Sequence, residues 1–172
     1  MKKLSSTFFL CLIFLLFSSC APDLTDDVEL AYDSVSCHTI DGNMWSPKSS
    51  YRMNWNLAVD YCNNLTACGY SDWHLPTISE LRTLIKNCSG TVTGGSCGVT
   101  DNCLSSSCWD EDSCWSCSYD DSGKYSKLGD TDWFWSSSTL SDDTGGAWLV
   151  DFGLGDVGYG IRSYDHYVRC VR

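Results

Sequence analysis

The sequence predicts a disulfide-rich α+β domain in which two helices are followed by a small, mainly antiparallel sheet. Two apolar stripes with helical spacing lie between residues 54 and 85. Short aromatic and β-branched runs, separated by turn residues, fill residues 133–171. Of the twelve cysteines, all except Cys11 and Cys20 lie at or after residue 37. Helices that precede the strands, rather than alternating with them, are typical of the α+β class.

The two helices have recognisable start signals. Asn54 can cap the first helix by accepting a hydrogen bond from its first turn. Thr77 and Glu80 form a capping box at the start of the second. Apolar residues at helical spacing form one face of each helix: Trp55, Ala58, Val59, Cys62 and Leu65 in the first, and Ile78, Leu81, Leu84 and Ile85 in the second.

Three strands are predicted near the C-terminus, at residues 133–135, 147–152 and 167–171. The glycine-rich residues 153–160 are interpreted as the turn between the last two strands. This segment contains a literal G-x-G-x-x-G, but a dinucleotide fingerprint requires a helix directly after the glycines. Because a strand pattern follows instead, we exclude that function.

The second predicted strand alternates in character. Trp148 and Phe152 alternate with Leu149 and Asp151, so one set is expected to face the core and the other not. We assign Trp135, Trp148 and Phe152 to the core.

The N-terminus predicts an export signal at residues 1–19. Lys2 and Lys3 precede an apolar run at residues 8–17, which is shorter than the roughly 20 residues of a membrane-spanning helix. Small residues and Cys20 follow, in an arrangement that resembles the bacterial lipoprotein cleavage site. We therefore expect Cys20 to carry a lipid.

This signal predicts a lipid-anchored protein of the bacterial cell envelope, exposed on the surface of the outer membrane. Secretion after ordinary cleavage behind Ala21 is the alternative, although Pro22 disfavours it. The polar, acidic residues 20–36 are interpreted as a tether, and residues 37–172 as one folded domain.

The formal charge of -11 limits the range of partners. Loss of Lys2 and Lys3 with the signal would lower it by two more units. Such a chain does not bind nucleic acid by neutralising phosphates, and anionic membrane surfaces repel it. We expect membrane attachment to come from the lipid alone.

A cysteine-rich insert is predicted at residues 88–132. Its six cysteines are expected to form local bridges, with Cys88 and Cys97 as one pair, since an exported chain is oxidised. Two alternatives are a zinc site and a redox dithiol. The zinc site would use Cys103, Cys108, Cys114 and Cys117, and the dithiol would use the last two of these.

Five motifs occur in a recognisable order: residues 55–62 (WNLAVDYC), 72–81 (DWHLPTISEL), 134–138 (FWSSS), 147–152 (AWLVDF) and 167–172 (YVRCVR). Together they resemble the C-terminal domain of the Legionella collagen-like protein and the related Fibrobacter major paralogous domains. The resemblance covers residues 37–172 and is interrupted only by the insert.

The resemblance implies a C-type-lectin-like fold with its two ends tied together. It implies a disulfide between Cys62 and Cys170, and more weakly one between Cys37 and Cys68. On the chain-entropy model, closing a loop of about 100 residues stabilises by up to about 4.7 kcal/mol.

Acidic clusters suggest a calcium site, although none has EF-hand spacing. The candidate ligands flank the first C-terminal strand: Asp130, Asp132, Asp142 and Asp143. Solvated acidic loops are the alternative. No catalytic constellation is visible, so an enzyme is not expected, and no other cofactor is predicted.

The segment between the last two strands mixes tyrosine with polar residues, as in antibody loops. In some relatives of the resembling family this position is hypervariable. We therefore predict a ligand-facing surface that consists of Asp156, Tyr159, Ile161, Arg162, Ser163, Tyr164, Asp165 and His166. An ordinary exposed hairpin is the alternative.

These observations together predict a surface lipoprotein that binds an extracellular glycan or protein, with adhesion as one role. A structural envelope protein without a specific ligand is the alternative. An enzyme acting on envelope polymers ranks third.

Overall fold

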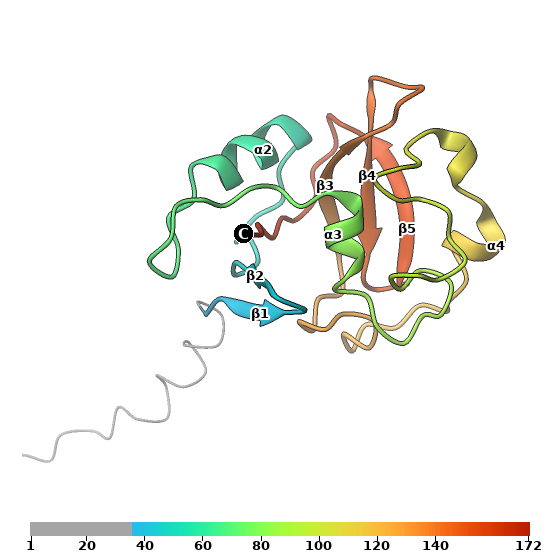
Figure 1. Cartoon of the computed structure of the whole chain (residues 1–172), viewed down its shortest axis with the longest axis horizontal. Helices are drawn as coiled ribbons and strands as arrows, with labels where there is room; N and C mark the ends of the chain where they lie inside the picture. The colour runs from blue at the N-terminus through green and yellow to red at the C-terminus, as the bar shows by residue number, and fades with distance from the viewer. Residues whose placement is uncertain (1–35) are drawn as a thin grey trace, which may run out of the picture.

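A computed structural model describes residues 36–172, and the predicted signal, Cys20 and most of the tether lie outside the described residues. The α+β class is confirmed, although a two-stranded hairpin that was not predicted precedes the helices (Figure 1). The elements are β1 (His38–Ile40), β2 (Asn43–Trp45), α2 (Trp55–Asn63), α3 (Ile78–Arg82), a 3-10 turn (Ser106–Cys108), α4 (Glu111–Cys114), β3 (Trp133–Thr139), β4 (Gly146–Asp151) and β5 (Asp156–Ile161).

Both predicted helices form, and both use the predicted caps. The Asn54 side chain accepts a hydrogen bond from the Leu57 amide at 3.1 Å. At α3, Thr77 and Glu80 exchange the two hydrogen bonds of a capping box. These signals are local in the chain, so sequence reasoning could find them.

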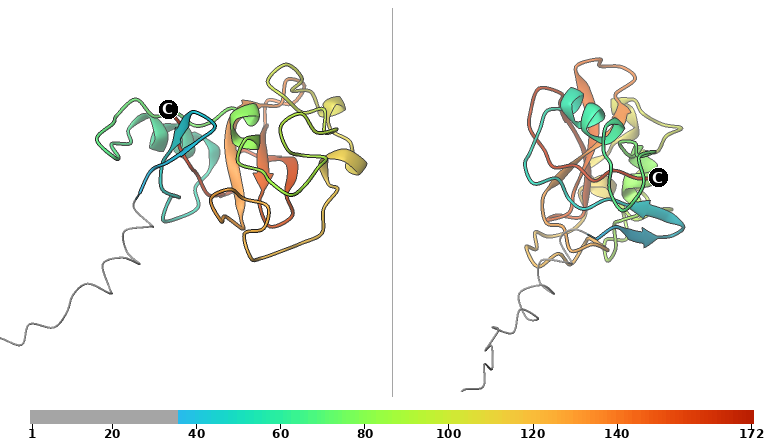
Figure 2. Two further views of the ribbon diagram at one scale, coloured as in Figure 1. Left: turned by 60° about the horizontal axis from the view of Figure 1, so that its bottom comes forward. Right: turned by 90° about the vertical axis from the view of Figure 1, so that its left-hand side faces the viewer.

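The central sheet is antiparallel, in the order β3-β4-β5, and is covered on both faces. Figure 2 shows α2 and the β1–β2 hairpin on one side of the sheet and the insert on the other. Phe134 and Trp148 belong to the core cluster under α3 and the insert, whereas Trp135 and Leu149 belong to the cluster under α2. Alternate residues of each strand therefore enter two different cores.

This double coverage corrects one expectation about the core. Trp135, Trp148 and Phe152 are fully buried as predicted. Leu149 and Asp151, which were expected to face away from the core, are buried as well. The second layer around α2 covers the face that the alternation pattern alone left open to solvent.

The third strand of the sheet is β5, not residues 167–171, and this prediction was wrong. Gly158 and Gly160 lie inside β5, where a Cβ atom would lie close to the side chains of Trp133 and Leu149, respectively. These glycines permit close packing against large side chains, so they do not mark a turn. The turn itself is confined to residues 152–155.

The C-terminal segment instead joins separate parts of the fold. Val171 forms isolated bridges with Trp45 and His74, and Tyr167 forms a parallel bridge with Phe134. Figure 1 places the C-terminus beside β2. The last residues therefore connect the β1–β2 hairpin to the central sheet.

The described residues contain five disulfides. The pairs that the family resemblance implied, Cys62–Cys170 and Cys37–Cys68, are both present. The predicted Cys88–Cys97 pair is wrong, because these cysteines bond to Cys117 and Cys114, respectively. The short helix α4 places Cys114 over the folded-back loop that carries Cys97. The fifth disulfide joins Cys103 to Cys108.

This pairing is incompatible with the zinc site, because Cys103, Cys108, Cys114 and Cys117 are all in disulfides. It is also incompatible with the redox dithiol, because Cys114 and Cys117 bond to other cysteines and not to each other. The insert also contributes to the main core. Cys97, Val99, Cys114 and Tyr125 are buried there beneath the sheet. The insert is thus an integral layer of the domain.

Candidate functional site

An aromatic groove of ≈ 340 Å³ lies along the outer strand β5. Its walls come from the insert, the first residue of β3, the β4–β5 turn and β5 itself. The lining residues are Trp109, Trp115, Trp133, Leu154, Asp156, Val157, Gly158 and Tyr159. We call this site the aromatic groove.

The rings of the groove are held in place by the surrounding structure. Trp109 donates from Nε1 to the Val157 carbonyl at 2.8 Å, which ties the insert to β5. Tyr159 contacts Trp109 edge-on at a centroid distance of 6.4 Å and Trp148 at 5.4 Å. Such edge-to-face contacts are the favoured aromatic geometry. The rings of Trp109 and Tyr159 are therefore fixed in place within the groove.

Three of these rings remain open to solvent. Trp115 is 54% exposed, Tyr159 50% and Trp133 37%. The disulfides of Cys114 and Cys117 flank Trp115 on both sides. A rigid aromatic surface of this kind is typical of a binding site.

Asp156 is the only ionisable side chain among the lining residues besides the Tyr159 phenol. It is 3% exposed, and its Oδ1 has no hydrogen-bond partner among residues 36–172. It stands opposite Asp151 in the β4–β5 register. Burial, and secondarily the charge of Asp151, raises the pKa of Asp156 to about 7.

Asp151 differs from its neighbour in having a partner. Its Oδ1 accepts a hydrogen bond from the Gly153 amide at 2.7 Å. Burial nevertheless raises the pKa of the Asp151 carboxyl, chiefly because water is excluded from it. Two buried carboxyls thus lie side by side at one end of the hairpin.

The predicted ligand surface is divided between two faces of the molecule. Asp156 and Tyr159 line the aromatic groove, whereas Arg162 and Ser163 line a separate hollow of ≈ 370 Å³ beside α2. The Arg162 guanidinium lies 3.7 Å from the centroid of the Trp55 ring.

The remaining predicted ligand residues lie in neither hollow. Ile161, Tyr164 and Asp165 are exposed. His166 is partly buried, 4.6 Å from Trp135 between ring centroids, and burial lowers the pKa of its imidazole. The segment is therefore not one continuous surface, because the chain leaves β5 after Ile161 and its next residues turn toward α2 and Trp135.

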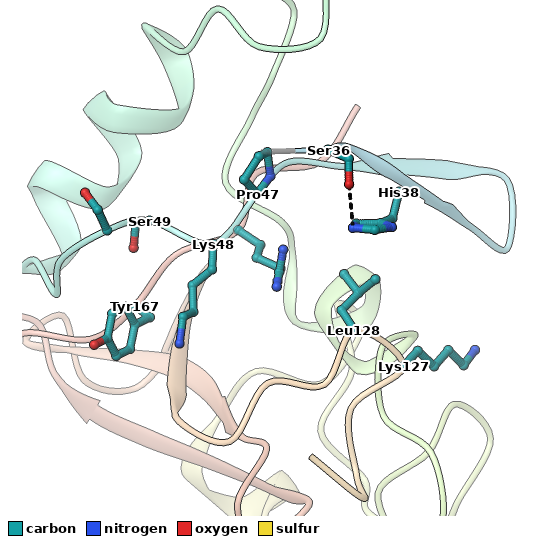
Figure 3. Close-up of a pocket in the computed structure, with 10 residues that line it drawn as sticks. Ser36, His38, Pro47, Lys48, Ser49, Lys127, Leu128 and Tyr167 are labelled. Atoms are coloured by element: carbon teal, nitrogen blue, oxygen red, sulfur yellow. Dashed lines mark hydrogen bonds between the residues drawn. The ribbon is translucent and has the colours of Figure 1, made fainter. Parts of the chain in front are cut away.

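A third hollow, of ≈ 670 Å³ and lined by basic residues, lies between the β1–β2 hairpin and the C-terminal segment (Figure 3). Lys48 lies beside the Tyr167 ring in Figure 3, 4.3 Å from its centroid. Each Lys or Arg that lines it is paired: Lys48 with Asp132, Lys127 with Asp41, and Arg169 with Asp130. Its positive charge is thus largely neutralised.

The four predicted calcium ligands are not brought together. Asp130 accepts two 2.8 Å hydrogen bonds from buried Arg169, and Asp132 pairs with Lys48 and Arg52. Asp142 accepts hydrogen bonds from the backbone and side chain of Ser106, which lower the pKa of its carboxyl. Asp143 accepts from the Gly145 amide. Among residues 36–172 no group of three or more His, Cys, Asp or Glu side chains could hold a metal.

Sequence reasoning missed Trp109, Trp115 and Trp133 as site residues. The feature of the sequence that could have identified them is that these tryptophans lie within, or directly after, an acidic, cysteine-rich insert. That insert has no strand or helix pattern that would explain buried tryptophans. Only the folding of the insert onto β5, and the pairing of β3 in the sheet, brings them to the same groove as Tyr159.

Comparison with protein families matches residues 35–172 to the Lcl C-terminal domain. No match was found among curated proteins. In the described part of the chain, none of the helices has the length and apolar character that a membrane span requires.

Proposed function

This chain belongs to the Lcl C-terminal domain family, and we propose that it is a surface-anchored lipoprotein that binds an extracellular ligand at the aromatic groove. The observation that carries this proposal is the set of three partly exposed rings beside a buried, unpartnered Asp156 carboxyl oxygen.

Exposed aromatic rings support binding because water solvates them poorly. Tryptophan and tyrosine are enriched where a few residues supply most of the binding energy. Here disulfides on both sides hold the backbone of Trp115, and Tyr159 belongs to strand β5, so little backbone entropy is lost when a ligand binds.

The described disulfides support an oxidising compartment, which agrees with the export signal. Disulfides of this density are uncommon in cytosolic proteins. The lipid anchor on Cys20 remains part of the proposal, and adhesion is one role such a protein would serve.

The test is binding of oxidatively folded residues 21–172 to a glycan array and to whole cells. We expect binding that Trp115→Ala and Tyr159→Ala reduce at least tenfold and that EDTA leaves unchanged. Tyr51→Ala is the matched control, since Tyr51 is equally exposed but lines a different hollow. Tyr164→Ala reports whether the adjacent loop participates.

Loss of binding in the control as well as in the groove variants would contradict the proposal. Absence of binding to every glycan and cell type would favour the second candidate, a structural envelope protein. That candidate is supported by the disulfides, which tie the C-terminal segment to α2 and stiffen the insert. Release by EDTA would instead indicate a calcium-dependent surface.

A further inference from the structure

The chemistry of the aromatic groove is unusual in that its charge is negative and its polar groups are few. No Lys, Arg or His is among the lining residues. The indole N–H of Trp109 is already used by the Val157 carbonyl. The Asp156 carboxyl and the Tyr159 hydroxyl remain as the acidic and hydroxyl groups of the wall.

This inventory disfavours two ligand classes. An anionic ligand would be repelled by Asp156 and would find no cation in the groove. A sugar presents several hydroxyls, and each one that is buried without a partner costs free energy. A wall with so few polar groups would leave most of them unpaired.

The aromatic rings and the single carboxyl group of the groove suit a cation that has an apolar surface. A positive charge is attracted to the face of an aromatic ring, most strongly to tryptophan. A primary ammonium brings three N–H donors that need acceptors, whereas a quaternary, fully methylated ammonium brings none. Methyl groups would contact the rings, and the charge would be balanced by the carboxylate.

We propose that the aromatic groove binds the quaternary, methylated ammonium group of an extracellular organic cation. Trp115, Trp133 and Tyr159 supply the aromatic walls, and Asp156 supplies the negative charge behind them. This inference rests on the proposed function and names the ligand class for the same groove.

The surroundings of the groove add to the attraction. Helix α4 packs against β5, and its cap and first turn carry Asp110, Glu111 and Asp112. These three acidic residues lie in the sequence between Trp109 and Trp115, two residues that line the groove. An organic cation would therefore approach through a negative field, which increases its rate of association.

The state of Asp156 also agrees with such a ligand. Its raised pKa reflects a buried carboxyl that lacks a compensating partner. A cation in the groove would supply that partner and stabilise the ionised form.

The test compares choline with 3,3-dimethylbutan-1-ol, a neutral molecule of the same shape. Binding to the oxidised chain is measured by calorimetry and by tryptophan fluorescence at pH 8. We expect choline and tetramethylammonium to bind at least tenfold more tightly than the neutral isostere and than methylammonium. Trp115→Ala and Asp156→Asn should each weaken choline about tenfold, and Tyr51→Ala should not.

Two further measurements identify whether the ammonium group belongs to a lipid or to a soluble molecule, and whether each variant is folded. Binding of phosphatidylcholine vesicles but not phosphatidylglycerol vesicles would indicate a lipid-borne group, and binding of free choline alone would indicate a soluble one. Both outcomes support the ligand class. Circular dichroism verifies that each variant keeps its fold.

Equal affinity for choline and the neutral isostere would overturn the inference, because the charge would then be irrelevant. Failure of all cations to bind, while Trp115→Ala still abolishes glycan or cell binding, would overturn the inference and leave the proposed function standing. Failure of both assays would overturn both.

Discussion

Two buried ionisable side chains, Arg82 and Asp156, differ in whether they have hydrogen-bond partners. Arg82, at the end of α3, donates to the carbonyls of Thr91, Val92, Cys97 and Val99, and so orders a loop that has no regular structure. Burial lowers the pKa of its guanidinium. Asp156 is the contrasting case, with an oxygen that no described group satisfies. Unpaired buried charge is costly, so its retention fits a role in binding.

A prediction about stability follows from Asp156. Its carboxyl ionises at its usual 3.8 in the unfolded chain but at about 7 in the folded protein. The folded state binds more protons between these values, so the free energy of unfolding falls as the pH rises through this window. Asp156→Asn removes this pH-dependent loss of stability. We expect the free energy of unfolding of the variant to exceed that of the wild type by up to about 4 kcal/mol at pH 8.

Urea unfolding at pH 4 and pH 8 measures this effect. The difference in the free energy of unfolding between variant and wild type should increase with pH. Asp151, whose pKa is also raised, leaves some pH dependence in both proteins. A difference that is the same at both pH values would show that Asp156 does not titrate in this range.

Individual elements owe their positions to the disulfides as much as to their own propensity. Helix α4 has four residues and would not persist alone. The Cys97–Cys114 bridge holds its C-terminal end, and the Cys88–Cys117 bridge holds the residues that follow. Trp115 lies between these two anchors. The position of the groove wall thus depends on covalent bonds within the insert.

We predict that replacing Cys97 and Cys114 together by alanine destabilises the domain by about 3 kcal/mol and weakens binding at the groove. The chain-entropy model assigns this cost to a loop with a sequence separation of 17. Replacing Cys103 and Cys108, whose separation is 5, should cost about 2 kcal/mol and leave binding unchanged.

Guanidinium unfolding and the binding assay, run on both double variants, test this expectation. Equal loss of binding in the two variants would mean that the groove depends on general stability rather than on the Cys97–Cys114 anchor.

The whole molecule is strongly acidic, with a formal charge of -11, yet it is proposed to reside at a membrane. Anionic lipid surfaces repel such a chain. The described domain also has no helix that meets the requirements of a span. We therefore propose that attachment depends on a lipid on Cys20.

We predict that Cys20→Ser transfers the protein from the membrane fraction to the soluble fraction of bacterial cells. Cys11→Ser is the matched control, because this cysteine lies in the apolar run of the signal and should not change the distribution. Fractionation and mass spectrometry of the N-terminal peptide measure the result. Membrane retention of Cys20→Ser would overturn the lipid anchor.

Local features of the fold were predictable because their causes are local. The caps at Asn54 and Thr77 satisfy backbone amides within three residues, and the sequence displays those residues directly. Strands β3 and β4 have hydrophobic runs of the expected kind. The β1–β2 hairpin turns at Asp41-Gly42, a dipeptide typical of tight hairpin turns in which both residues have positive φ.

The sequence by itself determined the class of the domain, its helix starts, its oxidised character and its family. Only the tertiary structure decided which cysteines pair in the insert, that β5 is a strand despite its glycines, and that Trp109, Trp115 and Trp133 line one groove with Tyr159. These outcomes depend on contacts between residues far apart in the chain. Such contacts are selected by packing against a shared core, which no local pattern encodes.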